Sequence, residues 1–514
     1  MENYLILAAI LIPLIGSVAV ALVSRYSEEL GGVATTVFCV AALGVVGWLY
    51  NLYNQGSALG LSFNVGLPFR LAFKLDALGL FMGLIATFVW VLASIYSLEY
   101  ITTRKTIFNV FLLMSLYGML GITMTANLFS LLMFFEVFSV ASAVLVMHEG
   151  TPEAQRAAFQ YLFISVVGSV AIILASAGIY TQTGSLNLMG RGIPGLSGNP
   201  LVPLFFWLLI GGFAVKAGMF PVHMWLPEAH PIAPSPASAL LSGVMIKAGA
   251  YGAIRVIYGI FGMHLVANMF TGKLLLALAV FTMIFGSIMA ITQTELKRML
   301  AYSSVAQIGY VMLGVSLLTP SGLTGGVLHI FNHALMKGSL FLAAGVIIHQ
   351  TGLRNLEDLS GIGKRLPLTM TAFTLSAFSM IGIPPFVGFF SKLYLALGAL
   401  QAGRSGYIGH WSAYGIVAAL IVSGLLNIVY YAPIIIRGWF GEPVPDSGPT
   451  HAHGHGHAAM ATAHDGGHAV KIRRVEPSWL MLVPMLTLAF ATLVFGLDIN
   501  VPLRLVGAVV RLYF

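Results

Sequence analysis

The sequence predicts an all-α, polytopic membrane protein with about fourteen transmembrane helices, and three observations support this fold class. Apolar residues make up 58% of the 514 residues and charged residues only 8%, whereas soluble domains carry about 25% charged residues. The mean hydropathy is +0.92. The apolar runs are long and continuous, without the alternation of a membrane β-strand. This composition excludes a water-soluble enzyme, a nucleic-acid-binding protein and a disordered chain.

Fourteen apolar segments have about the 20-residue length that a helix needs to cross a bilayer. They lie near residues 4–23, 30–53, 76–98, 107–125, 127–147, 157–181, 201–226, 236–259, 274–292, 302–318, 323–350, 367–400, 411–436 and 479–499. We expect five parts: an N-terminal three-helix segment (1–106), two five-helix repeats (107–259 and 274–436), a His-rich cytoplasmic loop (437–478), and a final helix with the C-terminus (479–514).

The distribution of basic residues predicts the orientation of the spans. Of 25 lysines and arginines, thirteen fall in loops after odd-numbered spans, eight fall on the opposite side, and four lie within spans. Cytoplasmic loops are enriched in basic residues. We therefore expect insertion in the plasma (inner) membrane with both termini on the non-cytoplasmic side. We expect no cleaved signal peptide, because Glu2 stands where a basic region would precede the apolar run.

Prolines interrupt two of the predicted spans. The seventh contains Pro221 and Pro227, and the stretch 231–236 that follows is too proline-rich for a regular helix. The twelfth contains Pro384 and Pro385. Broken backbone at membrane depth is tolerated only where protein or a water-filled cavity satisfies it. Interruptions in corresponding positions of two halves indicate a transport path.

The spans also show a faint internal repeat. The sixth span ends in Thr-Gln-Thr-Gly (181–184) and the eleventh in His-Gln-Thr-Gly (349–352), and an interruption follows each. Two five-helix units, spans 4–8 and 9–13, account for this spacing. Because each unit has an odd number of spans, the second is expected to be inverted relative to the first.

Ionisable side chains lie inside the apolar runs. Glu136 stands in the middle of the fifth, and Lys216, Lys247, Lys337 and Lys392 lie in the seventh, eighth, eleventh and twelfth. Each ion at the bilayer centre costs about 2.5–3.5 kcal/mol on insertion scales. Lys337 and Lys392 could partly avoid this cost by snorkelling, but the five charges together still cost roughly 10 kcal/mol, as much as the stability of a whole domain. We therefore expect them to have a function.

These residue types suit a proton relay. Burial favours the neutral form of an amine, and a nearby carboxylate favours the charged form. Glu136 and Lys216 are therefore predicted to act as an electrostatic switch, with Lys247 and Lys392 as later stations. His329, His333 and Lys337 follow at i, i+4 and i+8, which places them along one helix face. Neutral imidazole donates and accepts protons, so this stripe could connect two half-channels.

Other interpretations of the same residues remain open. Glu136 and one lysine could form a static ion pair between helices. His329 and His333 have HxxxH spacing but no evident third metal ligand, and they could equally hydrogen-bond neighbouring helices. His223 and His230 could cap the seventh-span break, and Arg255 could be a snorkelling anchor or a relay member.

The chain offers no cofactor motif. It has one cysteine, Cys39, and no glycine-rich nucleotide fingerprint. We expect no bound cofactor and no metal site. The loop 441–476 is a composition outlier with six of the fourteen histidines, and we interpret it as a solvated insert rather than a metal buffer or pH sensor. These histidines are His451, His453, His455, His457, His464 and His468.

Four stretches resemble the antiporter-like membrane subunits of respiratory complex I, membrane-bound hydrogenases and Mrp-type sodium/proton antiporters. They appear in family order: KAGMFPVHMWLPEAHPIAPSPASALLSGVMIK (216–247), ELKRMLAYSSVAQIGY (295–310), HIFNHALMKG (329–338) and GIPPFVGFFSK (382–392). The resemblance implies fourteen helices, inverted repeats and broken seventh and twelfth helices. It also implies that Glu136 is the switch carboxylate, Lys216 its partner, Lys247 the central lysine and Lys392 the exit residue.

Three functional hypotheses follow. The first is a proton-translocating subunit, without a redox centre, of a complex I-related hydrogenase or dehydrogenase complex, with paralogous antiporter-like and small helical subunits as partners. The second is the D-type subunit of a multisubunit sodium/proton antiporter. The third is a non-transporting scaffold whose buried charges only fix helix packing. The lipid bilayer is a partner in all three, and nucleic acid in none.

Overall fold

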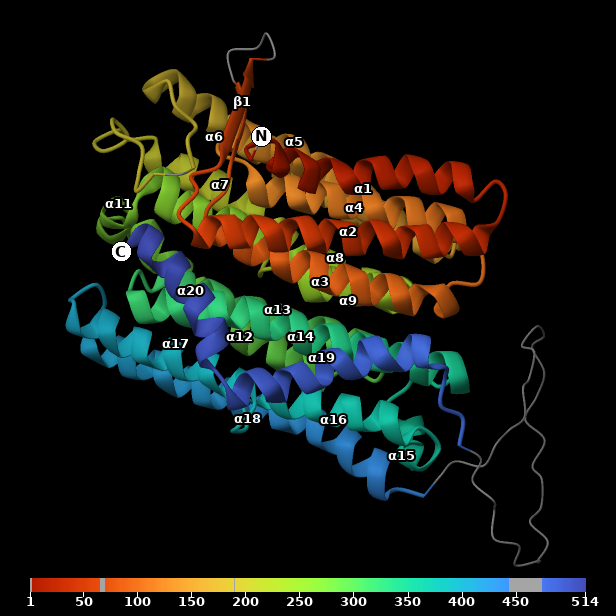
Figure 1. Cartoon of the computed structure of the whole chain (residues 1–514). Coiled ribbons are helices and arrows are strands. Elements are labelled where there is room, and N and C mark those ends of the chain that lie inside the picture. The colour runs from red at the N-terminus through yellow and green to blue at the C-terminus, as the bar shows by residue number, and fades with distance from the viewer. Residues whose placement is uncertain (1, 65–69, 189, 443–473) are drawn as a thin grey trace, which may run out of the picture.

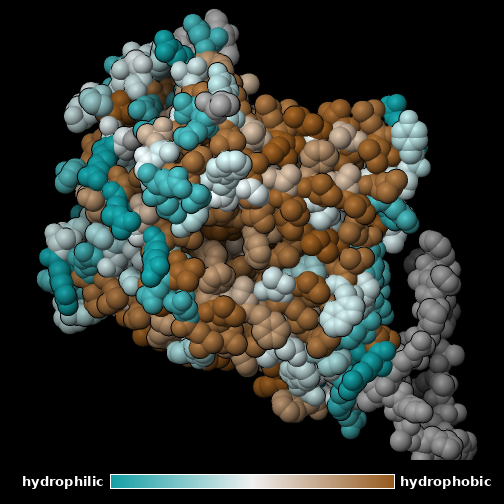
Figure 2. Space-filling view, viewed as in Figure 1, coloured by the Kyte–Doolittle hydropathy of each residue, from teal (hydrophilic) through white to brown (hydrophobic). Residues whose placement is uncertain are grey.

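The computed structural model describes residues 2–64, 70–188, 190–442 and 474–514. Figure 1 shows helices lying side by side, with the N-terminal helices (red to orange) on one side of the bundle and the C-terminal helices (green to blue) on the other. On the face shown in Figure 2, hydrophobic residues form a broad brown band and hydrophilic residues gather toward both ends. An apolar belt between polar ends matches a bilayer.

The chain begins with three long helices: α1 (Tyr4–Val23), α2 (Glu28–Asn54) and α3 (Ala77–Tyr100). Between α2 and α3 lies an antiparallel hairpin that we did not predict, β1 (Gly60–Asn64) and β2 (Arg70–Lys74), in register from Gly60↔Lys74 to Asn64↔Arg70. Half of the hairpin residues are exposed, and its two five-residue strands are too short to form an apolar run that marks them in the sequence.

The other regular elements of the described chain are helices. The first part comprises α4 (Lys105–Met124), α5 (Leu128–Val146), α6 (Pro152–Thr183), α7 (Val202–Ala217), α8 (Trp225–Ile232), α9 (Ser235–Leu240), the π-helix η1 (Leu241–Met245), α10 (Ile246–Ile254), the π-helix η2 (Arg255–Phe261) and α11 (Met263–Asn268). The second comprises α12 (Phe270–Ile291), α13 (Leu296–Ser316), α14 (Pro320–Thr351), the 3-10 turn η3 (Glu357–Leu359), α15 (Ile362–Arg365), α16 (Pro367–Ile381), α17 (Val387–Arg404), α18 (His410–Phe440), α19 (Trp479–Leu497) and α20 (Asn500–Tyr513).

Among the described residues, 12 helices are long and apolar enough to cross a membrane, counting Ser235–Phe261 as one. Two shorter apolar helices, α7 and α16, are the first halves of the predicted interrupted spans. The fold class is confirmed: this is an all-α, multi-pass integral membrane protein. The amphipathic α20 was not predicted; it follows α19 and packs against α3 and α14.

The two predicted five-helix repeats share construction details. α6 and α14 each have 32 residues, each follows a threonine cap and begins with proline, and each ends at a left-handed glycine, Gly184 or Gly352. In each unit an isolated antiparallel β-bridge joins the residue before one helix to the segment after the next helix. Asn127, before α5, pairs with Asn187, after α6, and Glu295, before α13, pairs with Asn355, after α14.

The helix breaks lie where proline and glycine predicted them. α7 ends at Gly218 and α16 at Gly382, both with positive φ, a conformation that glycine adopts without a Cβ clash. One expectation was wrong: Pro227 and Pro231 lie inside α8, so part of the 231–236 stretch is helical. Pro227 is in the first turn, where its missing N–H has no intrahelical acceptor, and Pro231 is next to the last residue.

One buried ion pair connects three parts of the fold. Asp76 accepts a hydrogen bond from the Gly79 N–H at the start of α3 (2.9 Å), and both its oxygens accept from the Arg255 guanidinium in η2 (2.6 Å each). Arg255 also donates to the Tyr513 hydroxyl of α20 (3.1 Å). Arg255 is only 1% exposed, so it does not reach toward the membrane surface.

Candidate functional site

Lys216 occupies the last turn of α7, just before the helix break, and is buried. Its Nζ donates to Ser139 Oγ of α5 (2.8 Å) and to the Tyr161 hydroxyl of α6. The rings of Phe135, Phe138 and Tyr161 surround the ammonium at 5.5, 5.1 and 4.5 Å, which are cation–π distances. The amine therefore has neutral partners.

Glu136 lies one helical turn before Ser139 but forms no ion pair with Lys216 in this structure. The carboxylate is half-buried, and its Oε1 has no hydrogen-bond partner among the described residues. It lines an apolar pocket of about 340 Å³ between α5 and α6. Lys216 is bound instead by the hydroxyl groups of Ser139, one turn along α5 from Glu136, and of Tyr161.

Lys247 lies in α10 and is fully buried. Its Nζ donates to the Ser242 carbonyl of η1 and lies 2.5 Å from His333 Nδ1 of α14. A π-helix places carbonyl groups out of the normal i→i−4 ladder. His333 therefore contacts the Lys247 amine, which cannot bind a metal ion while it is charged. No cluster of three or more His, Cys, Asp or Glu side chains occurs among the described residues.

The predicted stripe on α14 is buried along its whole length. The His329 and His333 rings are stacked with centroids 6.1 Å apart. His329 contacts Ser391 Oγ through Nδ1 (2.9 Å) and Gln307 Oε1 through Nε2 (2.8 Å). Lys337 donates to the Leu300 carbonyl (2.7 Å) and to Ser303 Oγ.

Lys392 stands beyond the second helix break, in α17. Its Nζ donates to the carbonyls of Met380 and Ile381 at the end of α16 (2.8 Å each). These carbonyls have no acceptor role within the helix that ends there. The ammonium also lies 5.1 Å from the centroid of the Tyr310 ring, which in turn lies 5.2 Å from the His329 ring.

These contacts form a continuous row through the second half of the bundle: Lys247, His333, His329, Tyr310 and Lys392. The first half is connected less directly. No hydrogen bond between described side chains joins Lys216 to Lys247. Their helices nevertheless pack closely, since a Cβ added to Gly249 would lie 2.4 Å from the Ala217 nitrogen.

Sequence reasoning missed two groups of polar residues. Lys297, which we placed in a loop, is buried at the start of α13 and donates to the Ala233 carbonyl (2.6 Å). It borders a pocket of about 400 Å³ that Glu149, Glu153 and Arg354 also line. Ser139 and Tyr161 were also missed, although their hydroxyl groups interrupt apolar runs in the sequence.

The three remaining residues near the first break have separate environments. His230 is buried and stacked on Phe341 at 4.6 Å, and neither ring nitrogen has a partner among the described residues. His223 packs between Phe220 and Phe285. Glu228 forms an exposed ion pair with Arg298 at 2.8 Å. The histidines of the loop, His451 to His468, lie outside the described residues.

Comparisons with known proteins agree with this architecture. Residues 125–417 match the family described as NADH:quinone oxidoreductase/Mrp antiporter, TM. The chain is 34% identical to NADH-quinone oxidoreductase subunit N of Desulforudis audaxviator over 506 residues, covering 97% of this chain and 96% of that relative. It is 31% identical to the D-type subunit of the Na(+)/H(+) antiporter of Alkalihalophilus pseudofirmus over 447 residues, covering 86% and 88%.

A solved structure gives the same result. A chain of the Mrp complex from Dietzia sp. DQ12-45-1b superposes with a TM-score of 0.85 at 26% identity, covering 100% of this chain and 97% of the other. Sequence and structure together show that the chain belongs to the NADH:quinone oxidoreductase/Mrp antiporter family, and that it is an antiporter-like, multi-pass membrane subunit.

Proposed function

We propose that the chain translocates protons as a subunit of a complex I-related, redox-driven membrane complex. The observation that carries the proposal is the row of ionisable side chains from Lys247 through His333 and His329, all three buried, to the half-buried Lys392, with Tyr310 between the last two. Buried ionisable residues are expensive at membrane depth and are retained for transport of ions or protons.

The first half of the proposed path is a two-position switch at Lys216. In this structure the ammonium is bound by Ser139 and Tyr161. The second position is beside Glu136, one turn along α5. Pairing with the carboxylate would stabilise the protonated amine. Return to the two hydroxyl groups would remove this stabilisation and make the amine a better proton donor. The half-buried Glu136 also lies where a neighbouring subunit at the α5–α6 surface could change its charge.

Entry to the second half is proposed at the polar pocket beside Lys297. Two glutamates and Arg354 line this pocket. Lys297 donates to the Ala233 carbonyl in the connection between α8 and α9, three residues after His230. Farther inside, His230 and His333 Nε2 have no hydrogen-bond partner among the described residues. Buried polar groups of this kind are commonly satisfied by ordered water. Water between them would carry protons toward Lys337 and Lys247.

The driving energy must come from outside the row. The proposed partners are the other membrane subunits of the complex, and each charge that crosses 100 mV requires about 2.3 kcal/mol. A redox reaction in a partner subunit would supply this energy.

The test compares charge-neutral variants of the switch with a surface control. In the assembled complex, Lys216→Ala and Glu136→Ala are each expected to lower proton pumping about tenfold or more, because a relay with one station missing is interrupted. Lys74→Ala, an exposed lysine of β2, serves as the control. Normal assembly with parental pumping in both switch variants would contradict the proposal.

The second candidate is the D-type subunit of a sodium/proton antiporter, which the likeness to the Alkalihalophilus antiporter chain and to the Mrp complex favours. An imposed sodium gradient, without electron donor, distinguishes the two: it would drive proton movement in vesicles only for the antiporter. The scaffold hypothesis makes a third prediction. Charge-neutral variants would then reduce assembly and leave transport per assembled complex unchanged.

A further inference from the structure

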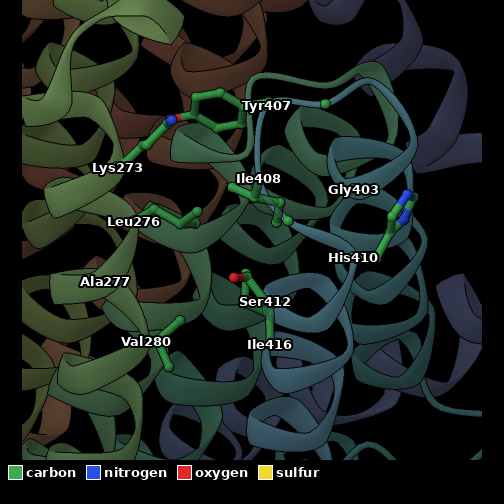
Figure 3. Close-up of a pocket in the computed structure, with 12 residues that line it drawn as sticks. Lys273, Leu276, Ala277, Val280, Gly403, Tyr407, Ile408, His410, Ser412 and Ile416 are labelled. Atoms are coloured by element: carbon green, nitrogen blue, oxygen red, sulfur yellow. The ribbon is translucent and has the colours of Figure 1, made fainter.

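A surface groove lies between α12 and the connection from α17 to α18, apart from the row of buried ionisable residues. Its cavity volume is about 720 Å³. The lower part is apolar, with Leu276, Val280 and Ile416 on its walls, as Figure 3 shows. Lys273 and Tyr407 lie toward the other end of the groove, and His410 lies on the opposite wall at mid-height. The groove therefore has one apolar end and one polar, basic end.

The basic end has no acidic counterpart nearby in the chain. The sequence contains no aspartate or glutamate between Glu228 and Glu295, and none between Asp358 and Glu442. These two stretches build the whole groove. The side chain of Lys273 is exposed. On the opposite wall, no side chain caps the N-terminus of α18 at His410, and its helix dipole adds positive potential there.

Tyr407 adds a hydrogen-bond donor. Figure 3 shows Lys273 and Tyr407 pointing toward each other across the polar end. The Tyr407 hydroxyl is buried and has no hydrogen-bond partner among the described residues. Burial raises the pKa of Tyr407 to about 12, so the hydroxyl keeps its proton at neutral pH and can donate it.

Aromatic side chains place this end of the groove at the membrane surface. Trp411 is 87% exposed and Tyr414 57% exposed, both in the first turns of α18. Exposed tryptophan and tyrosine are enriched at the depth of the lipid headgroups. The apolar end of the groove then lies at the depth of the acyl chains.

We propose that this groove binds an anionic diacyl phospholipid, with its phosphate at Lys273 and Tyr407 and an acyl chain along Leu276, Val280 and Ile416. The charge of the lining favours an anionic lipid over a zwitterionic one, since the groove carries the Lys273 ammonium and no carboxylate. The apolar end decides against a free phosphate ion, which would leave that surface uncovered.

The experiment uses the purified complex in phosphatidylcholine vesicles that contain a trace of phosphatidylglycerol with a photoactivatable acyl chain. Peptide mapping then locates the adducts. We expect labelling within residues 276–280 and 412–416. Lys273→Gln should lower this labelling about fivefold, the effect of one cation near an anionic headgroup. Lys74→Gln, an exposed lysine in another element, should leave it unchanged. Val280→Trp should lower it by filling the apolar end.

Four results would overturn the proposal. The first is equal labelling by a phosphatidylcholine probe of the same design. The second is Lys273→Gln labelled like the parent. The third is competition by inorganic phosphate at millimolar concentration, which would show an anion site without a lipid. The fourth is the absence of labelling together with a cross-link from Ser412→Cys to another subunit, which would show that a protein segment covers the groove.

Discussion

The four lysines inside the membrane share one property at the level of single residues: each donates to neutral oxygen or nitrogen atoms. Lys216 contacts hydroxyls, Lys247 a carbonyl and an imidazole, Lys337 a carbonyl and a hydroxyl, and Lys392 two carbonyls. The two ion pairs among the described residues, Asp76–Arg255 and Glu228–Arg298, involve arginine. A lysine without a fixed carboxylate can change its protonation state more easily than one in a permanent ion pair.

Tyr161→Phe tests whether the hydroxyl pair positions Lys216. The variant keeps the ring that packs on Trp225 at 4.5 Å but loses the hydroxyl that Lys216 and Ser142 contact. A hydrogen bond to a charged group contributes about 1.5–3 kcal/mol. We expect proton pumping to fall about tenfold with normal assembly. Tyr414→Phe, at an exposed tyrosine of α18, should pump like the parent; equal rates in both variants would show that the Tyr161 hydroxyl does not position the lysine.

At the level of elements, the broken helices bring charged side chains to the end of a neighbouring helix. The break between α16 and α17 lets Lys392 reach the terminal carbonyls of α16. The same break requires a close approach of the two segments, because a Cβ added to Gly388 would lie 1.9 Å from the Ser379 carbonyl oxygen. The lack of a side chain at Gly388 therefore allows α17 to approach α16 closely enough for Lys392 to reach its terminal carbonyls.

Gly388→Ala should displace α17 from α16 and destabilise the fold by about 1–3 kcal/mol, as overpacking of a core does. Thermal unfolding of the assembled complex and proton pumping would both be measured. Gly415→Ala in α18 is the matched control, since a Cβ there would meet nothing within 4 Å. If both variants unfold at the same temperature, the close approach at Gly388 does not constrain the break.

The buried pair Asp76–Arg255 joins α3, η2 and α20 and gives a second prediction for the elements. Asp76→Ala would leave the Arg255 guanidinium buried with only hydroxyl partners, Tyr251 and Tyr513. Removing one partner of a buried ion pair costs about 3–5 kcal/mol. We expect a large loss of thermal stability or of assembled complex.

Glu228→Gln is the comparison for that variant. Its ion pair with Arg298 has side chains 47% and 41% exposed, and such surface pairs contribute about 0–1 kcal/mol. A stability loss as large as that of Asp76→Ala would mean that burial does not explain the difference between the two ion pairs.

For the whole molecule, the positive-inside pattern predicts an orientation that can be measured with cysteine labelling. Cys39 is the single cysteine of the sequence and is buried, so the parent chain gives a low background. Ser405 and Thr102 are exposed at loops after an even and an odd span. A membrane-impermeant maleimide should label Ser405→Cys in intact cells and Thr102→Cys only after permeabilisation. The reverse pattern would place both termini in the cytoplasm.

Local composition was enough to establish the membrane class, the order of the spans and the two interruptions. Long apolar runs must be helical in lipid, and proline and glycine break a helix through their own backbone geometry. The family resemblance also came from contiguous stretches of residues. The seven candidate residues were recognisable because a charge or imidazole in an apolar run is unusual.

The contacts between these groups became known only from the way the helices pack in the structure. Lys216 contacts Ser139 and Tyr161 instead of Glu136, and Lys247 contacts His333 from 86 positions away. Arg255 pairs with Asp76 across 179 positions, and Lys297 lies buried although its position next to Arg298 predicted a loop. Such contacts depend on how helices distant in sequence pack in space, and hydropathy, which is summed along the chain, contains no information about that packing.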